Sequence, residues 1–248
     1  MISVKYIYIY FIGMKFKVNG ERNSGTNFLR TLLSTNFKGE VLEHYIVKKE
    51  VFFWKHAIPN PILKEKYPGI IDFFVVRDLN KWLVSMFKNV YHLKRFGNFK
   101  DFLTQNQVSY ERLLIDAYTK KLLNEDDNNK TIFHIRYYKL LGMMDYFKNN
   151  NNIVIVHLDI LQDEQRCIKF LEKVKKYFGL EQKNNYFSVN FRYLKVHYKV
   201  INEKNIDYNI NVENYKDIID KNKNQEIEDK LENICLIKIN NKIKKIQI

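Results

Sequence analysis

The sequence predicts an α/β fold with three layers, in which helices cover both faces of a central parallel sheet. Short apolar segments alternate with amphipathic segments along most of the chain, as in repeated strand–helix units. Several apolar segments are nearly continuous, which is typical of strands buried on both faces. At 248 residues, the chain is long enough for one domain with a single core.

The first third of the chain is expected to contain three strands and a helix. Residues 15–19 form the first predicted strand and run into a turn-rich segment at 20–25. Residues 26–33 follow as a helix, because their leucine and phenylalanine side chains recur at helical spacing. Apolar runs at 50–54 and 70–76 predict the second and third strands.

The rest of the single domain expected over 1–248 is mainly helical, with one further strand. Helical spacing of apolar residues predicts four helices, one beginning at Asn80 and the others at 110–123, 136–148 and 162–178. Gly179 would end the last of these at the C′ position. Residues 153–158 (IVIVHL) predict a buried strand. The polar tail at 202–248 has helical periodicity over 212–235, so we expect a C-terminal helical segment there.

Two features bear on the cellular compartment. Residues 1–14 are interpreted as an N-terminal extension, whose uninterrupted apolar run, 6–14, has nine residues and no small-residue cleavage site. Such a run is too short to span a bilayer, so we expect a further strand or a later start and no membrane span, with a signal anchor as the alternative. Cys167 and Cys235 show no metal-binding spacing and fit a reducing compartment, which favours the cytoplasm.

The chain is strongly basic, with 42 Lys and Arg residues against 28 Asp and Glu residues and a net charge of +14. This charge suits an anionic ligand such as a nucleotide, a sulfated or acidic glycan, or a nucleic acid. The abundance of Lys, Asn, Ile and Tyr is also what an AT-rich genome would produce, and charge by itself identifies a partner only weakly.

The segment 20–27 (GERNSGTN) has two glycines five residues apart, after a predicted strand and before a predicted helix. Glycines let backbone amides turn inward, and a helix N-terminus adds positive potential, so the segment suits a phosphate. The spacing matches the P-loop pattern G-x-x-x-x-G-K-S/T, but Thr26 and Asn27 replace its lysine and its magnesium-binding hydroxyl. We therefore expect a P-loop-like core that binds a phosphate donor without a metal. The alternative is an ordinary turn that opens a helix.

A second polar pair follows the strand at 70–76. Arg77 lies at the expected carboxyl end of that strand, where open α/β sheets bind ligands. Ser85 comes eight residues later, within the next helix. The guanidinium and the hydroxyl could converge on one phosphate through charge-assisted hydrogen bonds. The alternative is that Arg77 pairs with a nearby acid.

Together, RNSGTN before a helix and VVRDLNKWLVSMF resemble the two signatures of the nucleotide-dependent sulfotransferases, approximately P-K-S-G-T-T-W and V-x-R-x-P-x-D-x-x-x-S. The resemblance implies that the donor is 3′-phosphoadenosine-5′-phosphosulfate (PAPS). It also implies that the first signature binds the 5′-phosphosulfate, while Arg77 and Ser85 bind the 3′-phosphate. Arg22 is the loop cation here, since Asn23 stands at the family's lysine position. The residues implied for the nucleotide are Arg22, Asn23, Ser24, Gly25, Thr26, Asn27, Arg77 and Ser85.

A weaker similarity, between WKHAIP at 54–59 and the family's K-T-H-L-P segment, implies catalytic roles for Lys55 and His56. Sulfuryl transfer needs cations for the sulfate and bridging oxygens and a base for the acceptor. We assign the cationic roles to Arg22 and Lys55 and the base to His56, with Glu21 and Glu43 as rival bases.

The expected acceptor is a hydroxyl or amine compound, with a carbohydrate as one candidate, and no specific nucleic acid is expected. Two other functions remain open from the sequence. One is a magnesium-dependent P-loop kinase or NTPase, which the missing lysine disfavours. The other is a basic, non-catalytic protein that binds nucleic acid with a steep dependence on salt.

Overall fold

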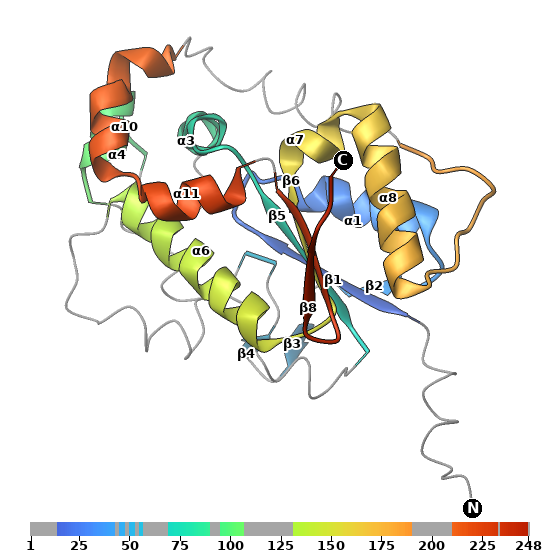
Figure 1. Ribbon diagram of the computed structural model, residues 1–248. Helices are drawn as coiled ribbons and strands as arrows, with labels where there is room; N and C mark the ends of the chain where they lie inside the picture. The colour runs from blue at the N-terminus through green and yellow to red at the C-terminus, as the bar shows by residue number, and fades with distance from the viewer. Residues whose placement is uncertain are drawn as a thin grey trace, which may run out of the picture.

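The computed structural model describes residues 14–42, 45–47, 50–52, 55–56, 69–89, 95–106, 131–189, 210–232 and 234–247. Within these residues, a central sheet has the strand order β2-β1-β5-β6-β7-β8 (Figure 1). Its strands are β1 (Lys15–Gly20), β2 (Glu40–Val41), β5 (Ile71–Val76), β6 (Ile153–His157), β7 (Cys235–Ile239) and β8 (Lys242–Lys245). The α/β class predicted from the alternating pattern is therefore confirmed.

The sheet is mixed rather than wholly parallel. Strands β2, β1, β5 and β6 are parallel, whereas β7 pairs antiparallel with β6, and β8 pairs antiparallel with β7. The helical prediction for the tail is therefore wrong at its C-terminal end. Asn240 and Asn241 both have positive φ, 48° and 62°, and join β7 to β8. A tight hairpin turn requires two residues with positive φ, and the Asn-Asn pair supplies them. The uniformly polar composition of the tail does not reveal this turn.

The predicted strand at 50–54 forms, but outside the central sheet. Strand β4 (Glu50–Phe52) pairs antiparallel with β3 (Tyr45–Val47) in a separate two-stranded sheet. A short apolar run indicates a strand but carries no information about its partner, and the nearest partner in sequence is favoured when the connection is short.

Helices cover both faces of the central sheet, as Figure 1 shows for α1, α7 and α8 on one side and α6 and α11 on the other. The helices are α1 (Thr26–Asn36), α3 (Leu79–Lys88), α4 (Phe99–Thr104), α6 (Ile132–Asn149), α7 (Leu158–Gln162), α8 (Glu164–Phe178), the 3-10 helix η4 (Val212–Tyr215), α10 (Lys216–Asn222) and α11 (Gln225–Leu231). None of the helices in the described part of the chain is long and apolar enough to cross a membrane.

The side chains of β5 show how the layers are held together. Phe73 and Val75 belong to a core cluster with α1, α7 and α8, whereas Phe74 and Val76 belong to a cluster with α6 and α11. This division follows from the alternation of side chains along a strand. A continuous apolar run is thus the sequence that a strand covered on both faces needs.

Several predicted boundaries differ from the structure. The helix predicted at 136–148 begins earlier, after Thr131, whose side chain and His134 form a capping box. The helix predicted at 162–178 is divided by Asp163, and its first part, α7, begins at Leu158, which was assigned to the preceding strand. Gly179 ends α8 in the left-handed conformation, as predicted. The predicted helix at 110–123, the extension at 1–13 and the rival base Glu43 lie outside the described residues.

Candidate functional site

The loop at 20–27, called here the glycine loop, lies at the topological switch point of the sheet. From β1, the chain passes through α1 to β2 on one side, while β5 lies on the other side of β1. Open α/β sheets bind ligands beyond the carboxyl ends of the strands at such a point. The glycine loop follows β1 and Arg77 follows β5. The fold therefore brings the two predicted halves of the site to neighbouring strand ends.

Both glycines of the loop are required by their surroundings. A Cβ on Gly20 would lie 2.7 Å from the carbonyl oxygen of Val75 and 2.7 Å from Oγ of Ser24. Gly25 has φ 92°, and a Cβ there would lie 2.4 Å from Cδ1 of Leu158. Gly20 thus packs closely against β5 and Gly25 against α7, which explains why a glycine is needed at both positions.

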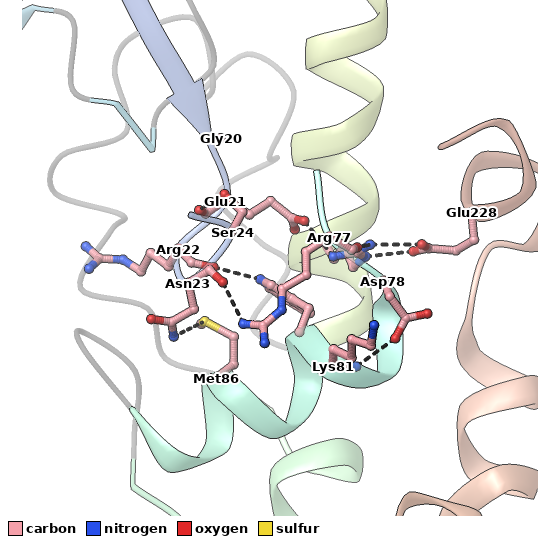
Figure 2. A network of polar contacts seen from close by, with 12 residues as sticks. Gly20, Glu21, Arg22, Asn23, Ser24, Arg77, Asp78, Lys81, Met86 and Glu228 are labelled. Carbon is pink, nitrogen blue, oxygen red and sulfur yellow. Dashed lines mark hydrogen bonds and ion pairs between the residues drawn. The ribbon is translucent and has the colours of Figure 1, made fainter. Parts of the chain in front are cut away.

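Three carbonyl groups of the glycine loop accept hydrogen bonds from side chains, two of them outside the loop and one within it. Trp82 donates its indole N–H to the Arg22 carbonyl at 2.9 Å, and Arg77 donates to the Asn23 carbonyl at 2.8 Å (Figure 2). The Ser24 hydroxyl donates to the Glu21 carbonyl at 2.6 Å. These bonds use three carbonyl acceptors of the loop. No side chain caps α1 at its N-cap residue, Gly25. An uncapped helix start of this kind favours an anion.

Lys55 and His56 dock directly on the glycine loop. The Gly20 amide donates to the Lys55 carbonyl at 2.9 Å, and the Lys55 ammonium donates to the side-chain oxygen of Asn27. Nδ1 of His56 lies 2.9 Å from the Gly20 carbonyl oxygen. A carbonyl can only accept, so this bond assigns the proton of the neutral imidazole to Nδ1 and leaves the lone pair on Nε2.

The protein strongly disfavours the charged form of His56. The pKa of His56 is lowered from 6.5 to about 3, mainly by burial and in smaller part by the charges of Lys139, Lys55 and Arg22, while the hydrogen bond with Gly20 opposes the shift. His56 is therefore neutral in this state. A general base works best with a pKa near the operating pH, so the low value argues against His56 as an efficient base without a bound anion.

The Arg77 side chain has no acidic partner among the described residues. The only hydrogen bond that its side chain makes within the described residues is the one to the Asn23 carbonyl, and its Nε is buried there without a hydrogen bond. Ser85 also lies next to the loop, but through its backbone: its carbonyl accepts from the Asn23 side chain at 3.3 Å. Figure 2 shows Arg22 extending away from Arg77, so the two predicted cations flank opposite sides of the glycine loop.

A cavity of about 360 Å³ lies beside Arg77 at the ends of β5 and β6. Strand-end residues on one side and η4, α10 and α11 on the other supply its lining, which includes Arg77, Asp78, Asn80, His157, Glu213, Lys216, Asp220, Lys223, Glu228, Asp229 and Glu232. Acidic groups outnumber cations along the C-terminal helices. The cavity therefore suits an uncharged or amine-bearing group, and the positive potential of this region is on the Arg77 side.

His157 contributes a hydrogen-bond donor to that cavity. The Asp159 amide donates to Nδ1 of His157 at 3.3 Å, so the proton of the neutral ring is on Nε2. Burial lowers the pKa of His157, although the charges of Asp159 and Asp78 act in the opposite direction. The lowered pKa keeps the ring neutral. The buried ring thus presents an N–H rather than a charge.

Two residues of the site were not predicted from the sequence. Arg136 in α6 is 2% exposed and hydrogen bonds with Glu21 of the glycine loop and Glu228 of α11. Lys139, one helical turn later, is close enough to lower the pKa of His56. The weak signal available was an arginine within the apolar run FHIRYY, since a charged residue among core positions requires a buried partner.

These groups together form a site suited to an anion with an uncharged extension. They are the glycine loop, the cations Arg22, Lys55 and Lys139, and the nearby Arg77. Glu21 is engaged by Arg136 in a buried ion pair of 2.5 Å, which favours a structural role over its predicted one as a rival base. Comparison of the chain with protein-family models, with curated proteins and with solved structures finds no match. The functional assignment therefore depends on the geometry of the site itself.

Proposed function

We propose that this protein is a PAPS-dependent sulfotransferase with a P-loop-like nucleotide-binding core, acting on a hydroxyl or amine acceptor such as a carbohydrate. The observation that carries the proposal is the 2.8 Å hydrogen bond from Arg77 to the Asn23 carbonyl, which joins the end of β5 to the glycine loop at the switch point. Thr26 and Asn27 replace the lysine and the magnesium ligand of NTP-hydrolysing P-loops, which favours this donor over an NTP.

The residues present fit the two charged ends of such a donor. The 5′ end would lie in the glycine loop, next to the uncapped start of α1 and the Lys55 ammonium. The 3′-phosphate would accept from Arg77, whose buried Nε has no hydrogen bond in the described chain, with the Ser85 hydroxyl as the second donor. The uncharged nucleoside would extend toward the cavity beside Arg77.

PAPS supplies the sulfuryl group and a bisphosphate leaving group when bound. Arg22 and Lys55 would stabilise the negative charge that develops on the oxygen atoms around the sulfur. His56 would hold the acceptor proton at Nε2, since its Nδ1 proton is engaged by Gly20. A bound anion would offset the charges of Lys55, Lys139 and Arg22, so we expect donor binding to raise the pKa of His56 toward the range of a general base.

Thermal-shift measurements test the proposal with three ligands. Adenosine 3′,5′-bisphosphate, the expected product, should stabilise the protein by about 2.7 kcal/mol at 100 times its Kd, or roughly 5–10 °C for a domain of this size. Stabilisation by ATP with Mg²⁺ alone would instead favour a kinase or NTPase. Salt-sensitive binding of oligonucleotides alone would favour a nucleic-acid-binding protein. Transfer of a labelled sulfuryl group to a panel of hydroxyl and amine acceptors would then identify the acceptor class.

Substitution of Arg77 tests the half-site directly. Arg77→Ala should raise the Kd for adenosine 3′,5′-bisphosphate by roughly tenfold or more, because a charge-assisted hydrogen bond is lost. Lys100→Ala removes an exposed cation from α4 and is the matched control, for which no change is expected. An Arg77→Ala protein with the parental Kd would contradict the assignment of the 3′-phosphate.

A further inference from the structure

Arg136 joins four parts of the structure that meet at the site. Its guanidinium donates to Glu21 of the glycine loop at 2.5 Å and to the Arg77 carbonyl at the end of β5 at 2.8 Å. It also forms a bidentate pair with Glu228 of α11, at 2.7 and 2.9 Å (Figure 2). The guanidinium lies over the ring of Trp82 in α3, 4.8 Å from the ring centroid. One buried side chain therefore fixes the loop, a strand end and two helices.

Glu21 creates an electrostatic problem that Arg136 solves. Glu21 follows Gly20 in the glycine loop, and its side chain is 4% exposed. A buried carboxylate in a loop that receives an anion would repel that anion strongly, because few water molecules screen the two charges. Arg136, which lies in α6, neutralises this carboxylate through the buried ion pair.

Glu228 in turn holds Arg136. The bidentate pair fixes the plane of the guanidinium, which sets the direction of the bonds to Glu21 and to the Arg77 carbonyl. Glu228 comes from the C-terminal part of the chain and also lines the cavity beside Arg77. The packing of α11 is thus connected to the neutralisation of the Glu21 carboxylate through the side chains of Glu228 and Arg136.

We propose that Arg136 is a positioning residue that makes the glycine loop able to bind an anion by neutralising Glu21, and that α11 controls this through Glu228. The identity of the anion rests on the proposed function, but the electrostatic role does not. Since coupling between two sites is reciprocal, an anion in the loop also stabilises the docked position of α11. The C-terminal helices are then part of the binding site rather than a passive cover.

A double-substitution experiment separates this role from a structural one. Arg136→Met should weaken binding of adenosine 3′,5′-bisphosphate by at least about tenfold, because the Glu21 carboxylate loses its ion pair with Arg136. Adding Glu21→Gln should restore most of the affinity, since the repelling charge is then absent. Lys238→Met is the matched control. Lys238 is another buried cation, it donates to the Phe147 carbonyl at the far end of α6, and its loss should lower Tm but leave the Kd within about twofold.

Two further measurements test the proposal without the nucleotide and without the Arg136→Met variant, which could fail to fold. Inorganic sulfate requires only the loop, so its Kd should show the same loss and rescue even if adenosine 3′,5′-bisphosphate does not bind. Glu228→Gln, a milder change, should weaken sulfate binding and increase acrylamide quenching of Trp82 in a Trp54→Phe background. Sulfate affinity that Glu21→Gln fails to restore would overturn the role of Arg136. Unchanged affinity and quenching in Glu228→Gln would overturn the role of α11.

Discussion

Gly25 combines a left-handed backbone with a close neighbour, and the two constraints have separate energetic consequences. Its φ of 92° is costly for any residue with a Cβ, and the position of Leu158 adds a steric clash. Gly179, at the end of α8, has φ 63° but no atom within 4 Å of the position of a Cβ. The two glycines therefore share the conformational requirement and differ in the packing requirement.

We expect Gly25→Ala to destabilise the protein more than Gly179→Ala. Left-handed strain should cost each variant about 1–2 kcal/mol, and only Gly25→Ala also displaces Leu158. Denaturant unfolding would give the free energies, and sulfate binding would show whether the loop keeps its shape. Gly25→Ala should lose sulfate affinity, whereas Gly179→Ala should retain it. Equal free energies of unfolding for the two variants would show that the contact with Leu158 is absent or easily relieved.

The lowered pKa of His56 makes stability depend on pH. The folded protein holds the pKa of His56 at about 3, against an unfolded value of 6.5, so the unfolded state binds more protons between these values. This contribution to stability is complete above pH 6.5 and is lost as the pH falls through the window toward 3. Between pH 7 and pH 5, above the range of most carboxylates, the free energy of unfolding should fall by roughly 1–2 kcal/mol.

Substitution identifies the part of this slope that belongs to His56. His157 also has a lowered pKa and contributes in the same direction, so the slope should become shallower in His56→Gln without disappearing. Urea unfolding at three pH values in this range would measure it. Parallel pH profiles for the parent and the variant would contradict the burial of a neutral His56.

Some residues of the candidate site can be predicted from the sequence and others cannot. The glycine spacing and Arg77 are local features, each attached to the end of a strand, so their positions followed once the strands were predicted. The contribution of Arg136 depends on which face of α6 packs against the glycine loop, and that is decided by tertiary contacts. The ion pair of Arg136 with Glu21 spans 115 positions, and no local pattern connects residues so far apart.

At the scale of elements, α7 and α8 show how one side chain can divide a continuous amphipathic segment. The Asp163 side chain accepts from the Arg166 amide at 2.9 Å and is the N-cap of α8. An aspartate that satisfies the amides of a new helix start also ends the preceding helix, because its own backbone is extended. The sequence periodicity continued across this point, which is why one helix was predicted in place of two.

We expect Asp163→Ala to destabilise the protein by about 1 kcal/mol, the usual cost of losing an N-cap. Asp163→Asn retains a side-chain oxygen that can accept from the same amide, so it should lose well under half as much. Both changes are on an exposed side chain, and packing of the core against α8 is unaffected. Urea unfolding of the two variants tests the assignment. If asparagine is as costly as alanine, the hydrogen bond to Arg166 does not define the helix start.

The strands β5 and β6 were predicted within one residue of their observed ends, because buried central strands consist almost entirely of apolar residues. The edge strands were harder to predict. Strand β8 has four exposed residues, KIKK, and strand β2 has only two residues, so neither shows a hydrophobic run. Edge strands commonly carry lysine, which prevents pairing with other chains but also hides the strand from a search for apolar segments.

At the scale of the whole molecule, the C-terminal hairpin completes the core. Strand β7 pairs with β6 along its length and places Cys235 and Ile237 in the cluster beneath α1 and α8. Ile246, just after β8, belongs to the same cluster, and Ile234 belongs to the cluster on the opposite face. Without the hairpin, β6 would become an edge strand whose first four residues, IVIV, are apolar. Such an edge is a template for association between chains.

A chain that ends after Glu232 should therefore fail to fold as a soluble monomer. It loses Ile234, Cys235, Ile237 and Ile246, all less than 9% exposed. At about 1.5–3 kcal/mol for each large apolar side chain, their combined loss approaches the total stability of a typical domain, about 5–15 kcal/mol.

A chain that ends at Ile246 keeps both strands of the hairpin and is the control. Size-exclusion chromatography and thermal unfolding of the two chains test this: the shorter chain should aggregate or lack a cooperative transition. If the shorter chain is a monomer that unfolds cooperatively with a near-parental Tm, the sheet is stable with β6 at its edge and the C-terminal hairpin is not needed for folding.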